Sequence, residues 1–234
     1  MRLLFLFCIF SHFCFGQAIT KAYLFPGQGS DERVFSKIKL DSSYQKIVVV
    51  YPLPQRGTTM TEYAHILSKQ IDTSEKYVLI GLSIGGMLCT EMADFLHPEK
   101  VIIISSAKCR SELPFHYRFQ RVIPLNKIIP KLLIKGGALL LQPIVEPDRN
   151  NNKAVFKSML KSKNPKYMKR TVNMIINWNR KTYSSKIVHI HGSNDHTIPI
   201  INVKVNYIIP EGSHMMTLTR GEELNKLILF ILHH

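Results

Sequence analysis

Six short runs of apolar, largely β-branched residues recur along the chain, and stretches with helical periodicity separate most of them. The runs cover residues 21–25, 46–51, 77–81, 101–105, 187–191 and 203–209. Nearly continuous apolar strands of this kind are typical of a parallel sheet that is covered on both faces. The helical stretches cover residues 31–38, 61–71, 84–96 and 222–232. This alternation predicts right-handed βαβ crossovers and a doubly wound, mainly parallel six-stranded sheet of the α/β class.

The alternation stops between about residues 109 and 183, where prolines and glycines divide several helical stretches and no strong strand occurs. We therefore predict a helical insertion between the fourth and fifth strands. A chain of 234 residues is long enough for one well-buried α/β domain and too short for two. The predicted organisation is a single domain over residues 17–234 that contains this insertion.

The N-terminus has the features of a secretory signal peptide. A basic start is followed by an apolar run over residues 3–15, and the small residues Cys14 and Gly16 precede a cleavage site before Gln17. The run is too short to span a bilayer comfortably. A buried first strand or an uncleaved anchor is the alternative. The pattern favours removal of the leader (residues 1–16) and export to the periplasm or the medium.

Two cysteines remain beyond the leader, Cys89 and Cys109. In an oxidising compartment they could pair, but their spacing along the chain does not decide it. Neither a CxxC motif nor a clustered histidine accompanies them, so the sequence predicts no zinc site. We expect neither a metal nor an organic cofactor.

The residues GLSIGG at 81–86 directly follow the third predicted strand and open the next helix. In a sharp strand-to-helix turn a serine is raised to the C-terminal edge of the sheet, and small residues two positions away let strand and helix pack closely. A bare GxSxG motif is common by chance, but its setting here adds specificity. We therefore predict Ser83 as a nucleophile and the backbone N–H of Ile84, at the helix start, as an oxyanion donor.

A serine needs a base that is held by an acid before it can act as a nucleophile. The stretch HGSNDHTIP at 191–199 places Asp195 in the loop after the fifth strand, and PEGSH at 210–214 places His214 after the sixth. All three groups thus emerge at the C-terminal edge, where open α/β sheets build their sites. The sequence predicts a catalytic triad of Ser83, Asp195 and His214.

These motifs, together with FPGQGS at 25–30, resemble those of the α/β-hydrolase superfamily over essentially the whole chain after the leader. The resemblance implies a serine hydrolase acting on a carboxylic ester, and an insertion that forms a cap over the nucleophile. It also implies a second oxyanion donor after the first strand, by position the backbone N–H of Gln28. The chain departs from the family by having Pro26-Gly27 in place of His-Gly, and by lacking two early strands, which implies a six-stranded core.

Two other classes of function stay open. One is an acyltransferase or thioesterase on the same fold. The FPGQGS stretch also resembles the opening of malonyl-carrier acyltransferases, although the interval from Gly27 to Ser83 is short for them. The other is a non-catalytic binding protein that kept the fold. Among the remaining histidines, we expect His189 and His191 to pack or hydrogen-bond within a strand. His196 could line the site, but we expect it to be a bystander.

Residues 108–186 hold 18 lysines and arginines against three acidic residues, so this segment carries the whole net charge of +15. Lysines four residues apart predict amphipathic helices with a lysine stripe: Lys127, Lys131 and Lys135, then Lys153, Lys157 and Lys161. The stripes indicate either a solvated face of a packed cap or a surface that attracts anionic lipid, a membrane or an anionic substrate. Nucleic-acid binding is not expected, because aromatic residues do not interleave with the basic ones. The oligomeric state is not predicted.

Overall fold

The computed structural model describes residues 19–122, 130, 136–137, 140, 146–147 and 152–234. Within them a six-stranded sheet has the order β2-β1-β3-β4-β5-β6, and every neighbouring pair of strands is parallel. This confirms the predicted doubly wound parallel sheet. The strands are β1 (Thr20–Phe25), β2 (Tyr44–Val48), β3 (Tyr77–Leu82), β4 (Lys100–Ile104), β5 (Ile187–Gly192) and β6 (Tyr207–Ile209).

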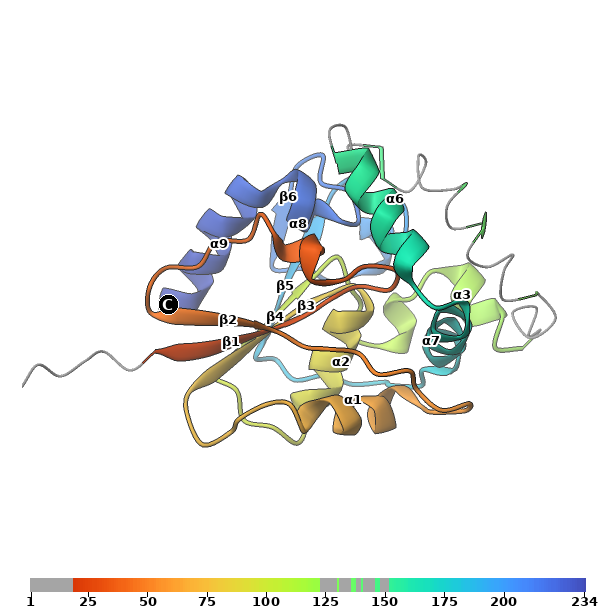
Figure 1. Cartoon of the computed structure of the whole chain (residues 1–234), viewed down its shortest axis with the longest axis horizontal. Coiled ribbons are helices and arrows are strands. Elements are labelled where there is room, and N and C mark those ends of the chain that lie inside the picture. The colour runs from red at the N-terminus through yellow and green to blue at the C-terminus, as the bar shows by residue number, and fades with distance from the viewer. Residues whose placement is uncertain (1–18, 123–129, 131–135, 138–139, 141–145, 148–151) are drawn as a thin grey trace, which may run out of the picture.

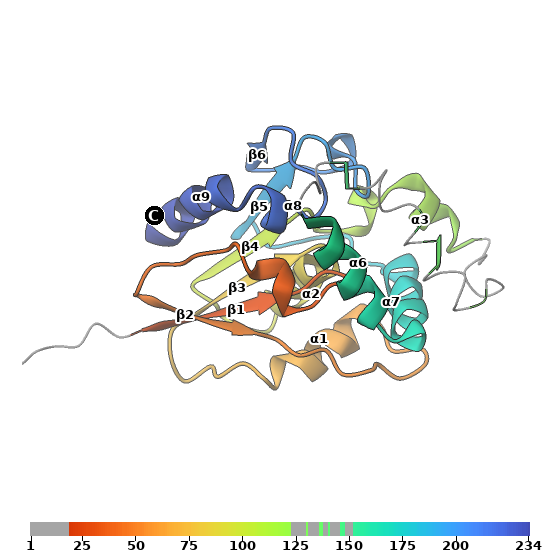
Figure 2. The same cartoon turned by 45° about the horizontal axis from the view of Figure 1, so that its top comes forward.

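Helices cover both faces of the sheet, as Figures 1 and 2 show. Along each inner strand, alternate side chains enter two separate apolar cores. Phe25 and Leu79 pack with α1, α2 and α7 on one face, whereas Leu24 and Ile80 pack with η1, α6, α8 and α9 on the other. These elements are η1 (Glu32–Phe35), α1 (Met60–Ser68), α2 (Ile84–Met92), α6 (Lys153–Ser162), α7 (Pro165–Asn177), α8 (Met216–Thr219) and α9 (Gly221–His233).

The helix predicted over residues 31–38 is only the short 3-10 turn η1. Asp31 caps this turn by accepting from the Arg33 N–H, and the Ser30 hydroxyl donates to the Gly27 carbonyl. The cap of this turn is therefore Asp31, the residue before its first turn.

The last predicted strand, 203–209, is shortened to β6. The side-chain oxygen of Asn206 accepts from the His189 N–H, so a side chain takes the position where a backbone carbonyl would extend the ladder. The helix predicted from residue 61 begins at Met60, because Thr59 and Glu62 form a capping box. These differences shift element ends and leave the order of the elements unchanged.

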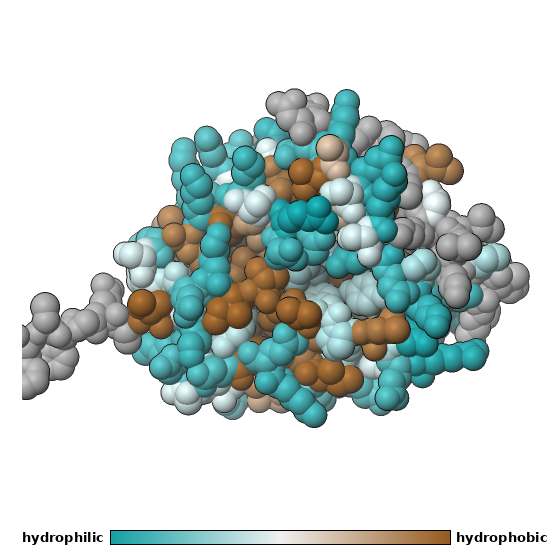
Figure 3. Space-filling model, in the orientation of Figure 1, coloured by the Kyte–Doolittle hydropathy of each residue, from teal (hydrophilic) through white to brown (hydrophobic). Residues whose placement is uncertain are grey.

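The described part of the predicted insertion is helical, with η2 (Arg110–Glu112), α3 (Phe115–Phe119), α6 and α7. Helix α6 exposes Lys153, Lys157 and Lys161 and buries Phe156 and Met159, which is the predicted amphipathic pattern. Figure 3 shows mainly hydrophilic side chains over this helix. The other lysine stripe (Lys127, Lys131 and Lys135) and the predicted signal peptide lie outside the described residues.

Cys89 and Cys109 are buried free thiols, so the disulfide that the sequence left open is not formed in this structure. Burial raises the pKa of the Cys89 thiol well above its ordinary value, which keeps the thiol protonated. In the part of the chain that the structure describes, no helix is both long and apolar enough to cross a membrane.

Candidate active site

Ser83 lies in the tight turn between β3 and α2. Its φ of 55° and ψ of −122° are outside the regions that L-residues normally occupy. Such a conformation persists only where the surroundings impose it. The Ser83 N–H donates to the Ile104 carbonyl at 3.0 Å, and the Ser106 hydroxyl donates to the Ser83 carbonyl at 2.7 Å. These bonds hold the turn on β4 and leave the Ser83 side chain at the C-terminal edge of the sheet.

Close packing around the turn requires its glycines. A Cβ on Gly81 would lie 2.5 Å from the Gly85 backbone, and a Cβ on Gly85 would lie 2.1 Å from the Phe25 carbonyl oxygen. A Cβ on Gly86 would lie 2.5 Å from the Ser106 hydroxyl. Strand β3, helix α2 and strand β1 therefore meet too closely for any side chain at these positions, which is the packing that the GLSIGG motif predicts.

We expect Gly85→Ala to destabilise the protein by the upper part of the about 1–3 kcal/mol that overpacking usually costs, because the added methyl group meets the backbone of β1. The measurement is the free energy of unfolding in urea. Gly136→Ala is the control, since a Cβ there meets no atom of the described residues within 4 Å. Equal loss of stability in the two variants would contradict this account of the turn.

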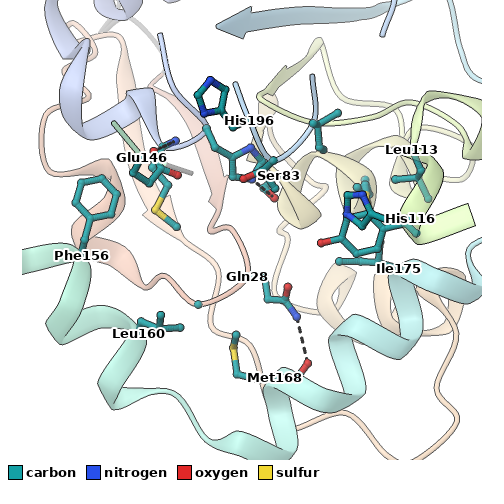
Figure 4. Close-up of a pocket in the computed structure, with 17 residues that line it drawn as sticks. Gln28, Ser83, Leu113, His116, Glu146, Phe156, Leu160, Met168, Ile175 and His196 are labelled. Atoms are coloured by element: carbon teal, nitrogen blue, oxygen red, sulfur yellow. Dashed lines mark hydrogen bonds between the residues drawn. The ribbon is translucent and has the colours of Figure 1, made fainter. Parts of the chain in front are cut away.

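The structure brings Asp195, which follows β5, and His214, which follows β6, to Ser83. His214 Nε2 lies 2.8 Å from Ser83 Oγ, and His214 Nδ1 lies 2.9 Å from Asp195 Oδ2. With Nδ1 protonated and donating to Asp195, Nε2 accepts the hydrogen of the Ser83 hydroxyl. The three residues that the sequence singled out thus form one hydrogen-bonded chain, and Figure 4 shows Ser83 at the cavity that it faces.

Asp195 is an acceptor for several groups at once. The backbone N–H groups of Thr197 and Ile198 donate to its Oδ1 at 2.9 and 2.8 Å, so its Oδ2 serves His214. Burial alone raises the pKa of Asp195, but the charge of His214 and these hydrogen bonds outweigh burial and leave the pKa below its ordinary value. Asp195 is therefore a buried carboxylate that stays ionised.

At His214, burial and the neighbouring charges also shift the pKa in opposite directions, and the net shift is upward. Burial lowers the pKa of His214, but the charge and hydrogen bond of Asp195, with the charge of Glu146, raise it above its ordinary value. The protonated imidazole is thus stabilised once His214 has taken a proton. A base that is held in this way suits the activation of a neighbouring hydroxyl group.

His189 and His191 lie behind Asp195 on β5. His191 Nε2 is 2.8 Å from the Ile198 carbonyl and 3.4 Å from Asp195 Oδ2, and its Nδ1 is 3.1 Å from His189 Nε2. Burial lowers the pKa of both imidazoles, which favours their neutral forms. They pack and hydrogen-bond within the strand, as predicted, whereas His196 lines the cavity, and its expected lack of a role stays a prediction.

The two predicted oxyanion donors lie on either side of the serine turn. Ile84 is the first residue of α2, and a Cβ on Gly27 would lie 3.3 Å from Ser83 Cβ, so the loop that carries Gln28 runs against the serine. The Gln28 side-chain amide donates to the Met168 carbonyl at 3.1 Å and to Thr171 Oγ1 at 2.7 Å. These bonds tie the loop to α7. Donation by the Ile84 and Gln28 N–H groups to an oxyanion stays a prediction.

A cavity of about 400 Å³ adjoins Ser83 and His214. Figure 4 shows Phe156 and Leu160 of α6 on one side of it, and Leu113, His116 and Ile175 on the other. Side chains of the insertion therefore form much of its wall, which suits an apolar part of a small ligand. Within the described residues, no group of three His, Cys, Asp or Glu side chains is placed to hold a metal ion.

Sequence reasoning missed Glu146, which lines the same cavity and is only 4% exposed. Its Oε2 accepts from the Ser213 hydroxyl at 2.6 Å and from the Met215 N–H at 3.1 Å, so it holds the residues on both sides of His214. Burial raises the pKa of Glu146 to about 7. The sequence did set Glu146 apart, because residues 108–186 hold 18 lysines and arginines and only three acidic residues, of which Glu146 is one.

Comparison with solved structures shows the same fold in many proteins, at low sequence identity. An enol-lactonase from Burkholderia xenovorans LB400 superposes with a TM-score of 0.70 at 11% identity and covers 92% of each chain. A thermophilic esterase from Thermogutta terrifontis has a TM-score of 0.70 at 17% identity, over 92% of this chain and 90% of the other. An esterase from Exiguobacterium antarcticum has a TM-score of 0.65 at 14% identity, over 92% and 93%.

No protein-family model and no curated protein matches the sequence. The structural likeness covers nearly the whole described chain, with the six-stranded parallel sheet and its flanking helices. The chain therefore has the α/β-hydrolase fold, as its motifs predicted.

Proposed function

We propose that this chain, with its α/β-hydrolase fold, is a serine hydrolase that cleaves a carboxylic ester through an acyl-enzyme on Ser83. The observation that carries the proposal is the hydrogen-bonded chain from Ser83 Oγ through His214 to the buried Asp195 beside an apolar cavity. The esterases of the same fold support the class of reaction. Fold alone would not, because one fold hosts many activities.

In the first half-reaction, Ser83 Oγ attacks the ester carbonyl carbon while His214 Nε2 takes the hydroxyl proton. Asp195 keeps the imidazole in the required tautomer and stabilises the imidazolium. The N–H groups of Ile84 and Gln28 stabilise the oxyanion of the tetrahedral intermediate. When the intermediate collapses, the C–O bond to the alcohol breaks, His214 returns its proton to the leaving oxygen, and the acyl group stays on Ser83.

In the second half-reaction, His214 takes a proton from water as the water oxygen attacks the acyl carbon. The bond from that carbon to Ser83 Oγ then breaks, and the proton on His214 restores the serine hydroxyl. The free acid leaves. Both steps need neutral His214, so kcat/KM falls as the pH drops through the pKa of His214, which is raised above its ordinary value.

The test is turnover of a panel of nitrophenyl esters of graded acyl length, with identification of the products. A cavity of about 400 Å³ with mainly apolar walls favours short to medium acyl chains over both acetate and long fatty acids. Products in the presence of added alcohols or thiols separate the alternatives, since an acyltransferase forms a new ester or thioester where a hydrolase releases the acid. Absence of turnover for every ester and thioester would favour the non-catalytic binding protein.

The lysine stripe of α6 supports a second proposal, that the cap attracts anionic membrane surfaces. Each lysine near such a surface contributes at most about 1 kcal/mol, over a screening length of about 8 Å at physiological salt. We expect binding to phosphatidylserine vesicles that weakens steeply with salt, little binding to phosphatidylcholine vesicles, and reduced binding when Lys153, Lys157 and Lys161 are changed to Gln. Cosedimentation measures this.

A matched control changes three exposed lysines outside the cap, Lys37, Lys39 and Lys226, to Gln. The total charge falls equally in both variants, so a specific role of α6 requires the control to keep its vesicle binding. Equal loss in the two variants, or no binding at low salt, would leave the stripe as a solvated helix face.

A further inference from the structure

Two histidines of β5 lie directly behind the acid of the triad. The side chains of His189 and His191 project from the same face of the strand, and both are fully buried. Strand β5 lies between β4 and β6 in the sheet, as Figure 2 shows. Neither histidine is among the residues that line the cavity at Ser83. Any effect that they have on catalysis must therefore act through another residue, and Asp195 is the member of the triad that His191 approaches.

The positions of the ring hydrogens on His191 follow from its contacts. His191 Nε2 lies 2.8 Å from the Ile198 carbonyl oxygen, and a carbonyl oxygen can only accept. Nε2 therefore carries a hydrogen and donates it. Because burial lowers the pKa of His191 and favours the neutral ring, Nδ1 is an acceptor. It receives the hydrogen on His189 Nε2, which lies 3.1 Å away. The contacts on its two sides thus fix His191 in one tautomer.

A count of ring hydrogens supports this tautomer. Two neutral imidazoles carry two such hydrogens, whereas bonds to the Lys204 carbonyl, between the rings and to the Ile198 carbonyl would need three. The contact without a hydrogen is then the longest one, 3.3 Å from His189 Nδ1 to the Lys204 carbonyl oxygen. That oxygen already accepts from Lys108 Nζ at 2.6 Å. Burial, with His191 and the charge of Lys108, holds the pKa of His189 well below its ordinary value, which disfavours a third ring hydrogen.

The hydrogen on His191 Nε2 holds the loop that carries Asp195. Ile198 accepts this hydrogen on its carbonyl, and the Ile198 N–H donates to Asp195 Oδ1 at 2.8 Å. One residue thus connects the His191 ring to the carboxylate. The other carboxylate oxygen, Oδ2, lies 3.4 Å from the same Nε2 and 2.9 Å from His214 Nδ1. The positive end of the His191 N–H dipole therefore lies near the oxygen that His214 contacts, and it stabilises the negative charge there.

We propose that His191 is a positioning residue of the triad, whose Nε2–H fixes the Ile198 end of the loop and keeps the Asp195 carboxylate in the orientation that His214 requires. The inference rests on the proposed serine hydrolase function and deepens it. It assigns a role in catalysis to a histidine that the sequence predicted only to pack or hydrogen-bond within a strand. His189 supports this role, because its donor occupies His191 Nδ1 and leaves the hydrogen of His191 on Nε2.

Two substitutions separate the N–H of His191 from the volume of its side chain. His191→Leu removes the donor, and because a shift of about 1 Å in a catalytic group can cost about 100-fold, we expect kcat to fall by about 10- to 100-fold. KM should stay nearly unchanged, since His191 does not line the cavity. A glutamine amide nitrogen has the reach of histidine Nε2, so His191→Gln can still donate to the Ile198 carbonyl and should recover most of the loss.

Leu67→Ala is the control for loss of stability. Leu67 is fully buried in α1, which lies apart from β5 in Figures 1 and 2. The change leaves a cavity in the core and should lower the melting temperature. It should keep kcat within a few fold of wild type, because it does not touch the loop that holds Asp195.

A second measurement reads the tautomers and needs no turnover. In protein labelled with nitrogen-15 histidine, NMR couplings between the ring nitrogens and the carbon-bound ring hydrogens distinguish an Nε2–H imidazole from an Nδ1–H imidazole. We expect Nε2–H for His189 and His191, and Nδ1–H for His214, at neutral pH. His214 should keep this form in His191→Gln and become a mixture of both tautomers in His191→Leu. Each signal is assigned by its loss when that histidine is replaced.

Wild-type kcat in His191→Leu would overturn the proposal, and so would an equal loss of kcat in Leu67→Ala. His191 with a hydrogen on Nδ1, or with both nitrogens protonated at neutral pH, would contradict it as well. If His191→Leu does not fold, the tautomers of the wild-type protein and the activity of His191→Gln decide. Failure of the proposed function looks different, since no variant would then turn over an ester while the tautomers could still be read.

Discussion

Ser83→Ala should lower kcat/KM for ester hydrolysis by about 10⁴–10⁶-fold, because members of such a catalytic unit act together and the residual rate comes from binding and oxyanion contacts alone. The change removes only Oγ. The Cβ stays, and so do the hydrogen bonds of the Ser83 backbone to Ile104 and Ser106, which hold the turn at a φ of 55°. The measurement is steady-state hydrolysis of the best ester in the panel, together with a thermal melt to verify the fold.

Ser193→Ala is the matched control. Ser193 is exposed near the same edge of the sheet, and its hydroxyl accepts from the Glu211 N–H without reaching His214. This variant should retain activity within a few fold of wild type. Substantial turnover by Ser83→Ala would show that the serine is not the nucleophile, and would end the serine hydrolase account even if the protein binds esters.

Asp195→Asn should cost about 10⁴-fold in kcat through the wrong tautomer of His214. The asparagine oxygen keeps the bonds from the Thr197 and Ile198 N–H groups, so the NH₂ group faces His214 Nδ1. Nδ1 must then act as an acceptor, and Nε2 carries the hydrogen toward Ser83. His214 is held in place but cannot take the serine proton.

Asp94→Asn is the control for Asp195→Asn, because Asp94 is an exposed carboxylate paired with Arg180 away from the site. We expect it to keep nearly full activity. If Asp195→Asn were as active as the parent, another carboxylate would be the partner of His214, and Glu146 would be the first to test.

The meeting of Ser83, Asp195 and His214 could be predicted, because each of them directly follows a strand of one parallel sheet. Each side chain follows the C-terminal end of a strand, and the C-terminal ends of parallel strands share one edge of the sheet. The apolar runs located those strands to within a few residues. Contact between the three side chains then follows from topology, even though 131 residues separate Ser83 from His214 in sequence.

Glu146 could not be predicted in the same way. It comes from the insertion, where no alternation of strand and helix sets the path of the chain, and its contacts with Ser213 and Met215 span 67 and 69 residues. Single side-chain hydrogen bonds also moved the ends of some elements away from their predicted positions. At Asn206, a side chain replaces a backbone partner and shortens β6, and no hydrophobic pattern reports such an exchange.

The most direct test of the central claim is covalent labelling with a fluorophosphonate probe, followed by mass spectrometry of the peptides. The probe reacts with a serine that a neighbouring base activates, and so it reports the nucleophile without knowledge of the natural substrate. We predict one adduct, on the peptide that contains Ser83, with loss of ester hydrolysis in proportion to labelling and no adduct in Ser83→Ala. Absence of labelling in the folded protein, or an adduct on another residue with hydrolysis retained, would contradict the claim that Ser83 is an activated nucleophile.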